Sequence, residues 1–266
     1  MKKYSLLFLS GILCITLSAL DNPSDAATQA VQKFERPQND IKILVLIIAS
    51  DDYPVYKELQ KIWCSYMHYD THHVEAYFIR GNPDLTTDYE IQGDVLWTKT
   101  PENLIPGILN KTVFSLEVFL PRIKNEFDYV LRTNLSSFYI FPRLLEYLSS
   151  CQRTNFYCAF PGEGFGSGSG FLMSSDTAEM LVQNKEGLVN KSMSLNDDVV
   201  IGSFFSTQGV LLIPHQRIDF FDIETWHRFK NMIPAGIFQV RVKNRDDLRL
   251  VNDTYIQSQL LAMFYK

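Results

Sequence analysis

The 266-residue sequence has little cysteine and no excess of positive charge. Outside the apolar N-terminal segment only Cys64, Cys151 and Cys158 remain, and an odd number of thiols makes no disulfide framework. Cys151 and Cys158 are close enough along the chain to be bridged, but three thiols buried as small hydrophobic groups would show the same pattern, and we favour burial. The 25 lysines and arginines are outnumbered by 30 acids, which argues against nucleic acid as a partner.

Several common catalytic motifs are also absent. The sequence contains no G-x-S-x-G elbow, no Walker loop, no H-E-x-x-H and no G-x-G-x-x-G after an expected strand. No pair of carboxylates with assignable acid and nucleophile roles stands out, so a polysaccharide-modifying hydrolase is the weakest reading. His68, His72 and His73 lie close together, but without a clear helix or a partner carboxylate motif. We interpret that segment as a solvated loop rather than a metal site.

The N-terminal segment has the pattern of a secretory signal. Lys2 and Lys3 precede an apolar run from residue 6 to residue 20. We predict a signal peptide or signal anchor over residues 1–26 and a linker without apolar periodicity over 27–40. The folded domain is expected over 41–266, in the secretory pathway, the periplasm or outside the cell. An uncleaved N-terminal anchor is the only membrane contact expected.

The rest of the chain alternates between strand and helix patterns. Residues 41–49 form a near-continuous aliphatic run, which is typical of a strand buried on both faces of a parallel sheet. Further strands are expected at 74–79, 94–97, 129–133, 166–172 and 240–243, and helices at 55–66, 111–124, 142–149, 175–182, 196–205 and 253–265. This alternation predicts one doubly wound α/β domain with its ligand at the carboxyl ends of the strands.

Six short segments, taken in order, carry a family resemblance. They are Phe78-Ile79-Arg80-Gly81, Gly93-Asp94-Val95-Leu96, Glu102-Asn103-Leu104 with Lys111-Thr112, Tyr129-Val130-Leu131-Arg132-Thr133, Gly168-Ser169-Gly170-Phe171-Leu172-Met173-Ser174, and Asp197-Asp198-Val199-Val200-Ile201-Gly202. In this order they resemble motifs of the inverting glycosyltransferases of the β-1,3-galactosyltransferase and Fringe type, which have the GT-A fold. The resemblance covers roughly residues 41–209, and the order of the segments is more specific than any one of them.

The resemblance implies both a fold and an activity. The fold expected is a GT-A-like, doubly wound α/β domain with a mostly parallel sheet flanked by helices. The activity expected is transfer of a hexose from a nucleotide sugar, a UDP-sugar by resemblance, to a glycan or glycoprotein acceptor with inversion. The alternative is a catalytically inactive GT-A-like module that binds carbohydrate or another partner.

The sequence departs from this family at the metal. In the family an Asp-x-Asp after the fourth strand holds a divalent cation, whereas this chain has Asn134-Leu135-Ser136. Hard cations are held chiefly by anionic oxygen ligands, so we expect no tightly bound cofactor and at most a weak Mn²⁺ or Mg²⁺ site. Cationic side chains are the obvious replacement for the metal charge. Alternatively, Arg241 and Lys243 simply alternate onto a solvated face of their strand.

The resemblance also implies the residues of the site. Asp198 matches the family's catalytic base, although an aspartate at this position also suits the beginning of a helix. The residues expected to bind the donor are Ser50, Asp51, Lys111, Arg132, Thr133, Asn134, Ser136, Arg241 and Lys243. The residues expected to face the sugar or the acceptor are Gly168, Ser169, Gly170 and Asp197.

Overall fold

The computed structural model describes residues 40–191, 194–244 and 248–266, which form one compact unit. The strands are β1 (Ile43–Ile48), β2 (Val74–Gly81), β3 (Tyr89–Gln92), β4 (Val95–Thr98), β5 (Tyr129–Asn134), β6 (Ser137–Tyr139), β7 (Tyr157–Pro161), β8 (Gly166–Ser174), β9 (Leu212–Pro214), β10 (Ile218–Phe220) and β11 (Gln239–Val242). The α-helices are α1 (Pro54–Cys64), α2 (Gly107–Glu126), α3 (Phe141–Ser149), α4 (Ser175–Gln183), α5 (Lys185–Lys191), α6 (Asp197–Thr207), α7 (Ile223–Phe229) and α8 (Arg249–Tyr265). A short 3₁₀ helix, Lys230–Met232, follows α7.

The expected signal or anchor (1–26) and all of the linker except Asp40 lie outside the described residues, so both stay predictions. Within the described ranges, no helix combines the length and the apolar composition needed to cross a membrane.

The large sheet has the strand order β3-β4-β2-β1-β5-β8-β7-β9. β1 pairs in parallel with β2 on one side and with β5 on the other, and β4 extends the parallel part beyond β2. β8 runs antiparallel between β5 and β7. The chain builds outward from β1 to β2 and β4 and later returns to β5, which places the topological switch point between β1 and β5. The expected doubly wound, mostly parallel α/β fold in a single domain is confirmed.

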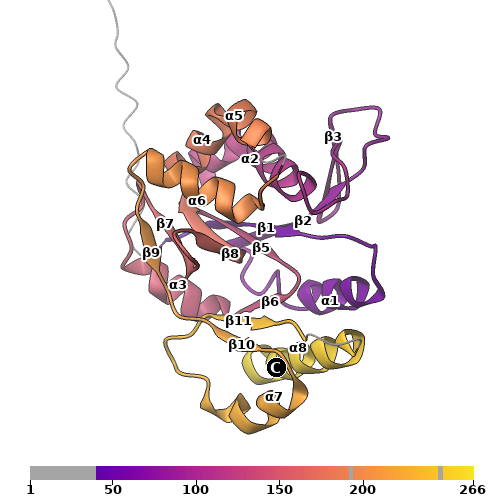
Figure 1. Cartoon of the computed structure of the whole chain (residues 1–266). Helices are drawn as coiled ribbons and strands as arrows, with labels where there is room; N and C mark the ends of the chain where they lie inside the picture. The colour runs from indigo at the N-terminus through magenta and orange to yellow at the C-terminus, as the bar shows by residue number, and fades with distance from the viewer. Residues whose placement is uncertain (1–39, 192–193, 245–247) are drawn as a thin grey trace, which may run out of the picture. The chain divides into compact units, whose positions relative to one another are not determined.

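Helices cover both faces of this sheet (Figure 1), and β1 shows why. Its odd-numbered residues, from Ile43 to Ile47, pack in one apolar cluster with side chains of α1, α3 and α8. Its even-numbered residues, from Leu44 to Ile48, pack in a second cluster with α2, α4 and α6. Successive side chains of a strand point to opposite faces, so a strand that is apolar at every position must be covered twice. Burial of each such side chain contributes roughly 1.5–3 kcal/mol.

A small sheet of order β10-β11-β6 joins the C-terminal part of the chain to the end of β5. β6 begins two residues after β5, and in its antiparallel register with β11 it places Ser137 opposite Arg241. The Val242 backbone N–H donates to the Ser136 carbonyl oxygen at 2.7 Å. In Figure 1 the yellow strand β11 runs directly beside β6. The last strand of the chain is therefore fixed beside the loop that ends β5.

Some local structure differs from the expectation. β3, β6, β7, β9, β10, α5 and α7 had no expected counterpart, because runs of three to seven residues show too little periodicity to be recognised. Cys64, Cys151 and Cys158 are all free thiols. Burial is confirmed for Cys158, whereas Cys151 is half-buried and Cys64 is exposed, so the expectation of three buried thiols is wrong for Cys64.

Candidate active site

The loop that follows β5 lies at the switch point of the sheet, where ligands of doubly wound folds bind. Asn134 is the last residue of β5, and its amide is held from both sides. Its Nδ2 donates to the Gly168 carbonyl oxygen at 3.2 Å, and its Oδ1 accepts the Ser136 backbone N–H at 3.1 Å. Asn134 and Ser136 therefore lie between the glycine-rich start of β8 and the end of β11.

Asp198 lies directly beside the same glycine-rich segment, in the first turn of α6. Its Oδ2 accepts the Gly168 backbone N–H at 2.8 Å, and its Oδ1 accepts the Val199 backbone N–H at 3.0 Å. Asn196 occupies the N-cap position of α6 but makes no side-chain capping hydrogen bond. The Asp198 carboxylate is half-buried, so it is both fixed and accessible.

Cationic side chains from β11 and α8 gather on the other side of this loop. The guanidinium of Arg241 is 4.0 Å from Asp219, and its buried Nε has no hydrogen-bond partner among the described residues. Burial and the nearby Arg217 lower the pKa of Arg241, while Asp219 and Asp198 act in the opposite direction. Desolvation together with Arg241 and Arg249 lowers the pKa of Lys243. Arginine nevertheless stays charged in proteins, so this cluster carries positive charge that its own acids do not fully balance.

Arg217 and Asp219 belong to the same region, although the sequence analysis did not identify them. Arg217 Nη2 donates to Asp219 Oδ2 at 2.8 Å, and Arg217 Nη1 donates to the Ser167 hydroxyl at 3.0 Å. The Arg217 guanidinium also stacks 4.1 Å from the centroid of the Phe160 ring. This pair ties the β10–β11 sheet to the start of β8. The pairing of the three-residue strand β10 with β11 positions Arg217 and Asp219. No spacing in the sequence predicts that pairing.

Four of the expected binding residues form ion pairs with other side chains of the protein, three of them buried and one, Asp51, exposed. Arg132 is 1% exposed and forms a buried ion pair with Asp197. Burial raises the pKa of the Asp197 carboxyl, and the Arg132 guanidinium opposes that rise. Lys111 Nζ lies 2.8 Å from Glu102 Oε2 and 3.1 Å from the Ala49 carbonyl oxygen, and burial lowers its pKa. Asp51 pairs with Arg80 at 2.6 Å.

These contacts separate two groups within the expected set of binding residues. Arg132, Lys111, Asp51 and Asp197 each have their charge balanced by a neighbour within the protein. We therefore assign Arg132 and Asp197 to the buried support of the site and leave Lys111 and Asp51 out of its charged surface. Ser50 has a local role at the end of β1, where its hydroxyl oxygen accepts the Asp52 backbone N–H at 3.1 Å.

Thr133, Ser169 and Gly170 form the buried floor of the site. The Thr133 hydroxyl donates to the Ser169 carbonyl oxygen at 2.9 Å, and the Ser137 hydroxyl donates to the same oxygen at 2.7 Å. Thr133 is fully buried and Ser169 is 3% exposed. These residues hold β8 against β5 and β6, while Gly168 above them stays half-buried. Six of the expected residues thus lie together, and we call them the switch-point site: Asn134, Ser136, Gly168, Asp198, Arg241 and Lys243.

A prediction on stability follows from this floor. Gly170→Ala is expected to destabilise the fold by about 1–3 kcal/mol, which is the usual cost of overpacking. The added Cβ would overlap the Tyr139 hydroxyl and lie 3.0 Å from Gln239 Nε2, and both neighbours are buried. Gly187→Ala in α5 is the control, because its Cβ would meet nothing within 4 Å. Urea unfolding of both variants measures the difference, and equal stability would contradict the packing described.

The oxygen atoms that could act as metal ligands at the switch-point site do not suit a hard divalent cation. Asn134 and Ser136 provide an amide and a hydroxyl, and the amide oxygen already accepts a backbone N–H. Asp198 provides a carboxylate whose two oxygens both accept backbone hydrogen bonds. Mg²⁺ and Ca²⁺ sites depend on several free anionic oxygens. The cationic side chains of Arg241 and Lys243 would further repel a metal ion.

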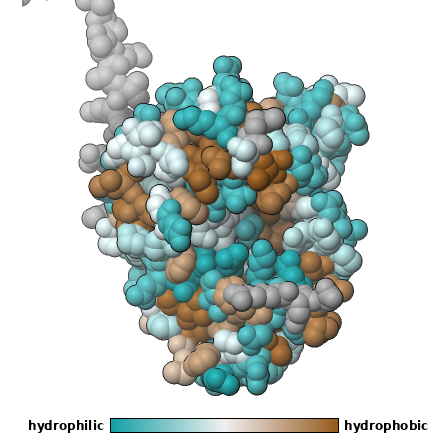
Figure 2. All heavy atoms as spheres, in the orientation of Figure 1, coloured by the Kyte–Doolittle hydropathy of each residue, from teal (hydrophilic) through white to brown (hydrophobic). Residues whose placement is uncertain are grey.

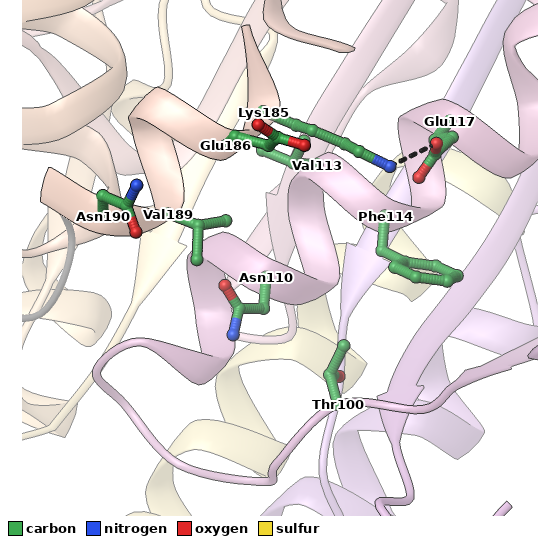
Figure 3. A pocket seen from close by; sticks show the side chains of 9 residues that line it. All are labelled: Thr100, Asn110, Val113, Phe114, Glu117, Lys185, Glu186, Val189 and Asn190. Carbon is green, nitrogen blue, oxygen red and sulfur yellow. Dashed lines mark hydrogen bonds and ion pairs between the residues drawn. The ribbon is translucent and has the colours of Figure 1, made fainter. Parts of the chain in front are cut away.

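A separate cavity of about 480 Å³ lies between α2, α5 and the loop after β4. Figure 3 shows Asn110 between Val189 and Thr100, with the Lys185–Glu117 ion pair, 2.6 Å long, at the opposite side of the cavity. None of the residues of the switch-point site lines it. Hydrophilic surface gathers instead in a band between the part of the molecule that contains α6 and the part that contains β10, β11 and α8 (Figure 2).

Comparisons with known proteins add little to this geometry. No protein-family model matches the sequence, and no curated protein matches it. Among solved structures, the chain is similar to a crystallised glycosyltransferase involved in the glycosylation of the major capsid of PBCV-1. The likeness covers 82% of this chain and 99% of that chain, at 9% sequence identity and a TM-score of 0.47. A likeness at this level carries no argument about activity, so function must be argued from the site.

Proposed function

We propose that this protein is a glycosyltransferase that moves a hexose from a UDP-sugar to a glycan or glycoprotein acceptor with inversion. One observation carries the proposal. The loop after β5 joins a carboxylate to the strand that carries the cations: Asn134 donates to the Gly168 carbonyl oxygen, and the Gly168 N–H donates to Asp198. At the other end of the loop, the backbone N–H of Val242, which lies between Arg241 and Lys243, donates to the Ser136 carbonyl oxygen. An inverting transfer needs this arrangement, because the base and the leaving group act on opposite faces of the sugar.

Asp198 is the proposed base. An acceptor hydroxyl attacks the anomeric carbon of the donor, its proton passes to the Asp198 carboxylate, and the bond from that carbon to the UDP oxygen breaks. The hydrogen bonds from the Gly168 and Val199 backbone N–H groups, 2.8 and 3.0 Å long, orient the carboxylate before reaction. Gly168 has no side chain, and a Cβ there would lie 2.9 Å from Asp198 Oδ2, so only glycine leaves this approach open.

Arg241 and Lys243 are the proposed partners of the diphosphate. Negative charge builds up on the β-phosphate as the bond to the sugar breaks, and fixed cations stabilise that charge. A guanidinium fits phosphate oxygens with two parallel hydrogen bonds, and the Nε of Arg241 is a donor that has no acceptor among the described residues. Asn134 and Ser136 complete the cradle on the β5 side. No step of this mechanism passes through a metal ion.

Release of UDP tests the proposal directly. The full chain is incubated with UDP-glucose or UDP-galactose, with and without oligosaccharide acceptors, and UDP is measured by anion-exchange chromatography. We expect slow release with donor alone and faster release with an accepted glycan. A chain that binds glycans in calorimetry but never releases UDP from any hexose donor would instead be the inactive carbohydrate-binding module, which the missing Asp-x-Asp motivates.

Metal removal gives a second prediction. Excess EDTA is expected to change the Kd for UDP-hexose by less than about threefold, because the donor atoms at Asn134 and Ser136 bind hard cations weakly at best. Isothermal titration calorimetry with EDTA, with added Mn²⁺ and with neither provides the comparison. Strict dependence of donor binding on Mn²⁺ or Mg²⁺ would contradict the cationic cradle while leaving the proposed transfer itself in place.

We further propose that the chain acts in the secretory pathway, the periplasm or outside the cell, as the N-terminal signal pattern predicts. Glycans and glycoproteins are available as acceptors in these compartments. An uncleaved signal would anchor the domain to a membrane at its N-terminus.

A further inference from the structure

A group of metal-ligand side chains lies outside the switch-point site. Asp40, His72 and His73 each offer one ligand atom, and these three atoms lie within 4.8 Å of one another. His72 Nε2 is 3.1 Å from Asp40 Oδ1, and the two imidazole rings meet edge to face with centroids 4.7 Å apart. These histidines are expected in a solvated loop from the sequence, which shows no partner carboxylate motif near them. The structure supplies one from a residue 32 positions earlier in the chain.

The backbone around these side chains is held by hydrogen bonds. The Ile43 N–H donates to the His73 carbonyl oxygen at 2.8 Å, which joins the segment before β1 to the turn before β2. Asp70 closes the turn, since its Oδ1 accepts the His72 backbone N–H at 3.2 Å and its carbonyl oxygen accepts that of His73 at 3.1 Å. The three ligand side chains therefore come from two short segments whose relative position is fixed before any ion binds.

His73 also has the outer contact that metal-binding histidines usually show. Its Nδ1 lies 2.7 Å from the Ile41 carbonyl oxygen. A carbonyl only accepts, so this ring nitrogen carries the proton, and the other nitrogen keeps the lone pair that a metal needs. His72 is 65% exposed at its side chain and Asp40 is 33% exposed, so an ion can reach them from solvent.

The set of ligand atoms indicates the class of metal. Two imidazole nitrogens and one carboxylate suit Zn²⁺ and similar transition metals, whereas Mg²⁺ and Ca²⁺ prefer sites made of oxygens. Three protein ligands leave the fourth tetrahedral position of Zn²⁺ for water. We propose that Asp40, His72 and His73 form a zinc site that ties the chain before β1 to the turn before β2.

This site is separate from the proposed transfer chemistry. Asp40 and His73 precede β1 and β2, so they lie at the amino-terminal edge of the parallel strands, whereas the switch-point site follows β5 at the carboxyl edge. Zinc bound here would stabilise the fold, because an ion that binds only the folded state shifts the equilibrium toward it. The proposal does not depend on the protein being a transferase.

Calorimetric titration of the untagged full chain with ZnCl₂ in a non-coordinating buffer tests the proposal. We expect one ion per chain and a higher Tm in the presence of Zn²⁺. His72→Gln and His73→Asn are each expected to weaken zinc binding by at least about tenfold, as the loss of one of three ligands predicts. His72→Gln changes an exposed side chain, and His73→Asn keeps an amide N–H near the Ile41 carbonyl, so both should fold; far-UV circular dichroism verifies this.

His68→Ala is the matched control. His68 is also exposed and pairs with a carboxylate, Asp94, at 2.9 Å, but it does not belong to the group of three ligand atoms. This variant should bind zinc as the unchanged chain does. Two results would overturn the proposal: no zinc binding by the unchanged chain at millimolar concentration, or equal affinity in the unchanged chain and in folded His72→Gln and His73→Asn. Donor binding and UDP release are measured separately, so failure here leaves the proposed transfer untouched.

Discussion

Replacing Arg241 and Lys243 together with alanine is expected to weaken UDP-hexose binding by roughly 10²- to 10⁴-fold, because each charge-assisted hydrogen bond contributes about 1.5–3 kcal/mol. Arg241 lies on β11 opposite Ser137, and Lys243 comes directly after the end of that strand. Burial, and then the neighbouring arginines, lower the pKa of both groups. Phosphate oxygens would supply the missing partners. Isothermal titration calorimetry with UDP-glucose and UDP-galactose measures the loss.

The matched control removes the same amount of charge from exposed positions. Lys61 and Lys124 each form a surface ion pair, with Glu58 and Glu179 respectively. Lys61→Ala with Lys124→Ala should therefore leave donor affinity nearly unchanged, since exposed pairs contribute only about 0–1 kcal/mol. Arg241→Lys should lie between the unchanged chain and the double variant, because it keeps the charge and loses the planar fork. Unchanged donor affinity in the Arg241 and Lys243 double variant would mean that these cations merely occupy a solvated strand face.

The fold could be predicted well from the sequence, because its main determinant is local. The side chains of the aliphatic run that begins at Ile41 can all be buried only if the run is a strand covered on both faces. β1 is such a strand. The switch point then follows from the order of strands and helices along the chain. The β10–β11–β6 sheet could not be predicted in the same way, because its pairing joins β6 to strands about 80 to 100 residues later and β10 has three residues.

The candidate site could be predicted less well, because a residue's type does not say what neutralises its charge. Lys111 and Arg132 were expected to face phosphates, yet Glu102 and Asp197 neutralise them inside the protein. Asp197 is 65 residues from Arg132 in sequence, so only the fold shows that pair. Arg241 differs from Lys111 and Arg132, because its buried Nε has no acceptor among the described residues. Only the structure shows this difference.

Asp198→Asn is expected to lower kcat for UDP release by about 10²- to 10⁴-fold, which is the usual contribution of a general base. The substitution preserves the size of the side chain, and the amide oxygen can still accept the Gly168 or the Val199 backbone N–H. What it removes is the ability to take a proton from the acceptor hydroxyl. Donor affinity should change by less than about threefold, because Asp198 is not among the groups proposed to bind the diphosphate. Steady-state kinetics and calorimetry on the same preparation separate the two effects.

Asp176→Asn distinguishes catalysis from helix capping. Asp176 also lies in the first turn of a helix, α4, and accepts a backbone N–H, that of Asn155, at 2.9 Å. If Asp198 only stabilised the start of α6, both variants would lose a similar free energy of unfolding, about 0.3–1 kcal/mol, and neither would lose activity. A base predicts a different pattern, in which the two variants have similar stability but only Asp198→Asn loses kcat. Because the variant keeps one of the two backbone hydrogen bonds that hold the side chain, a loss of kcat without a loss of stability would identify Asp198 as a proton acceptor and not merely a residue that stabilises the start of α6.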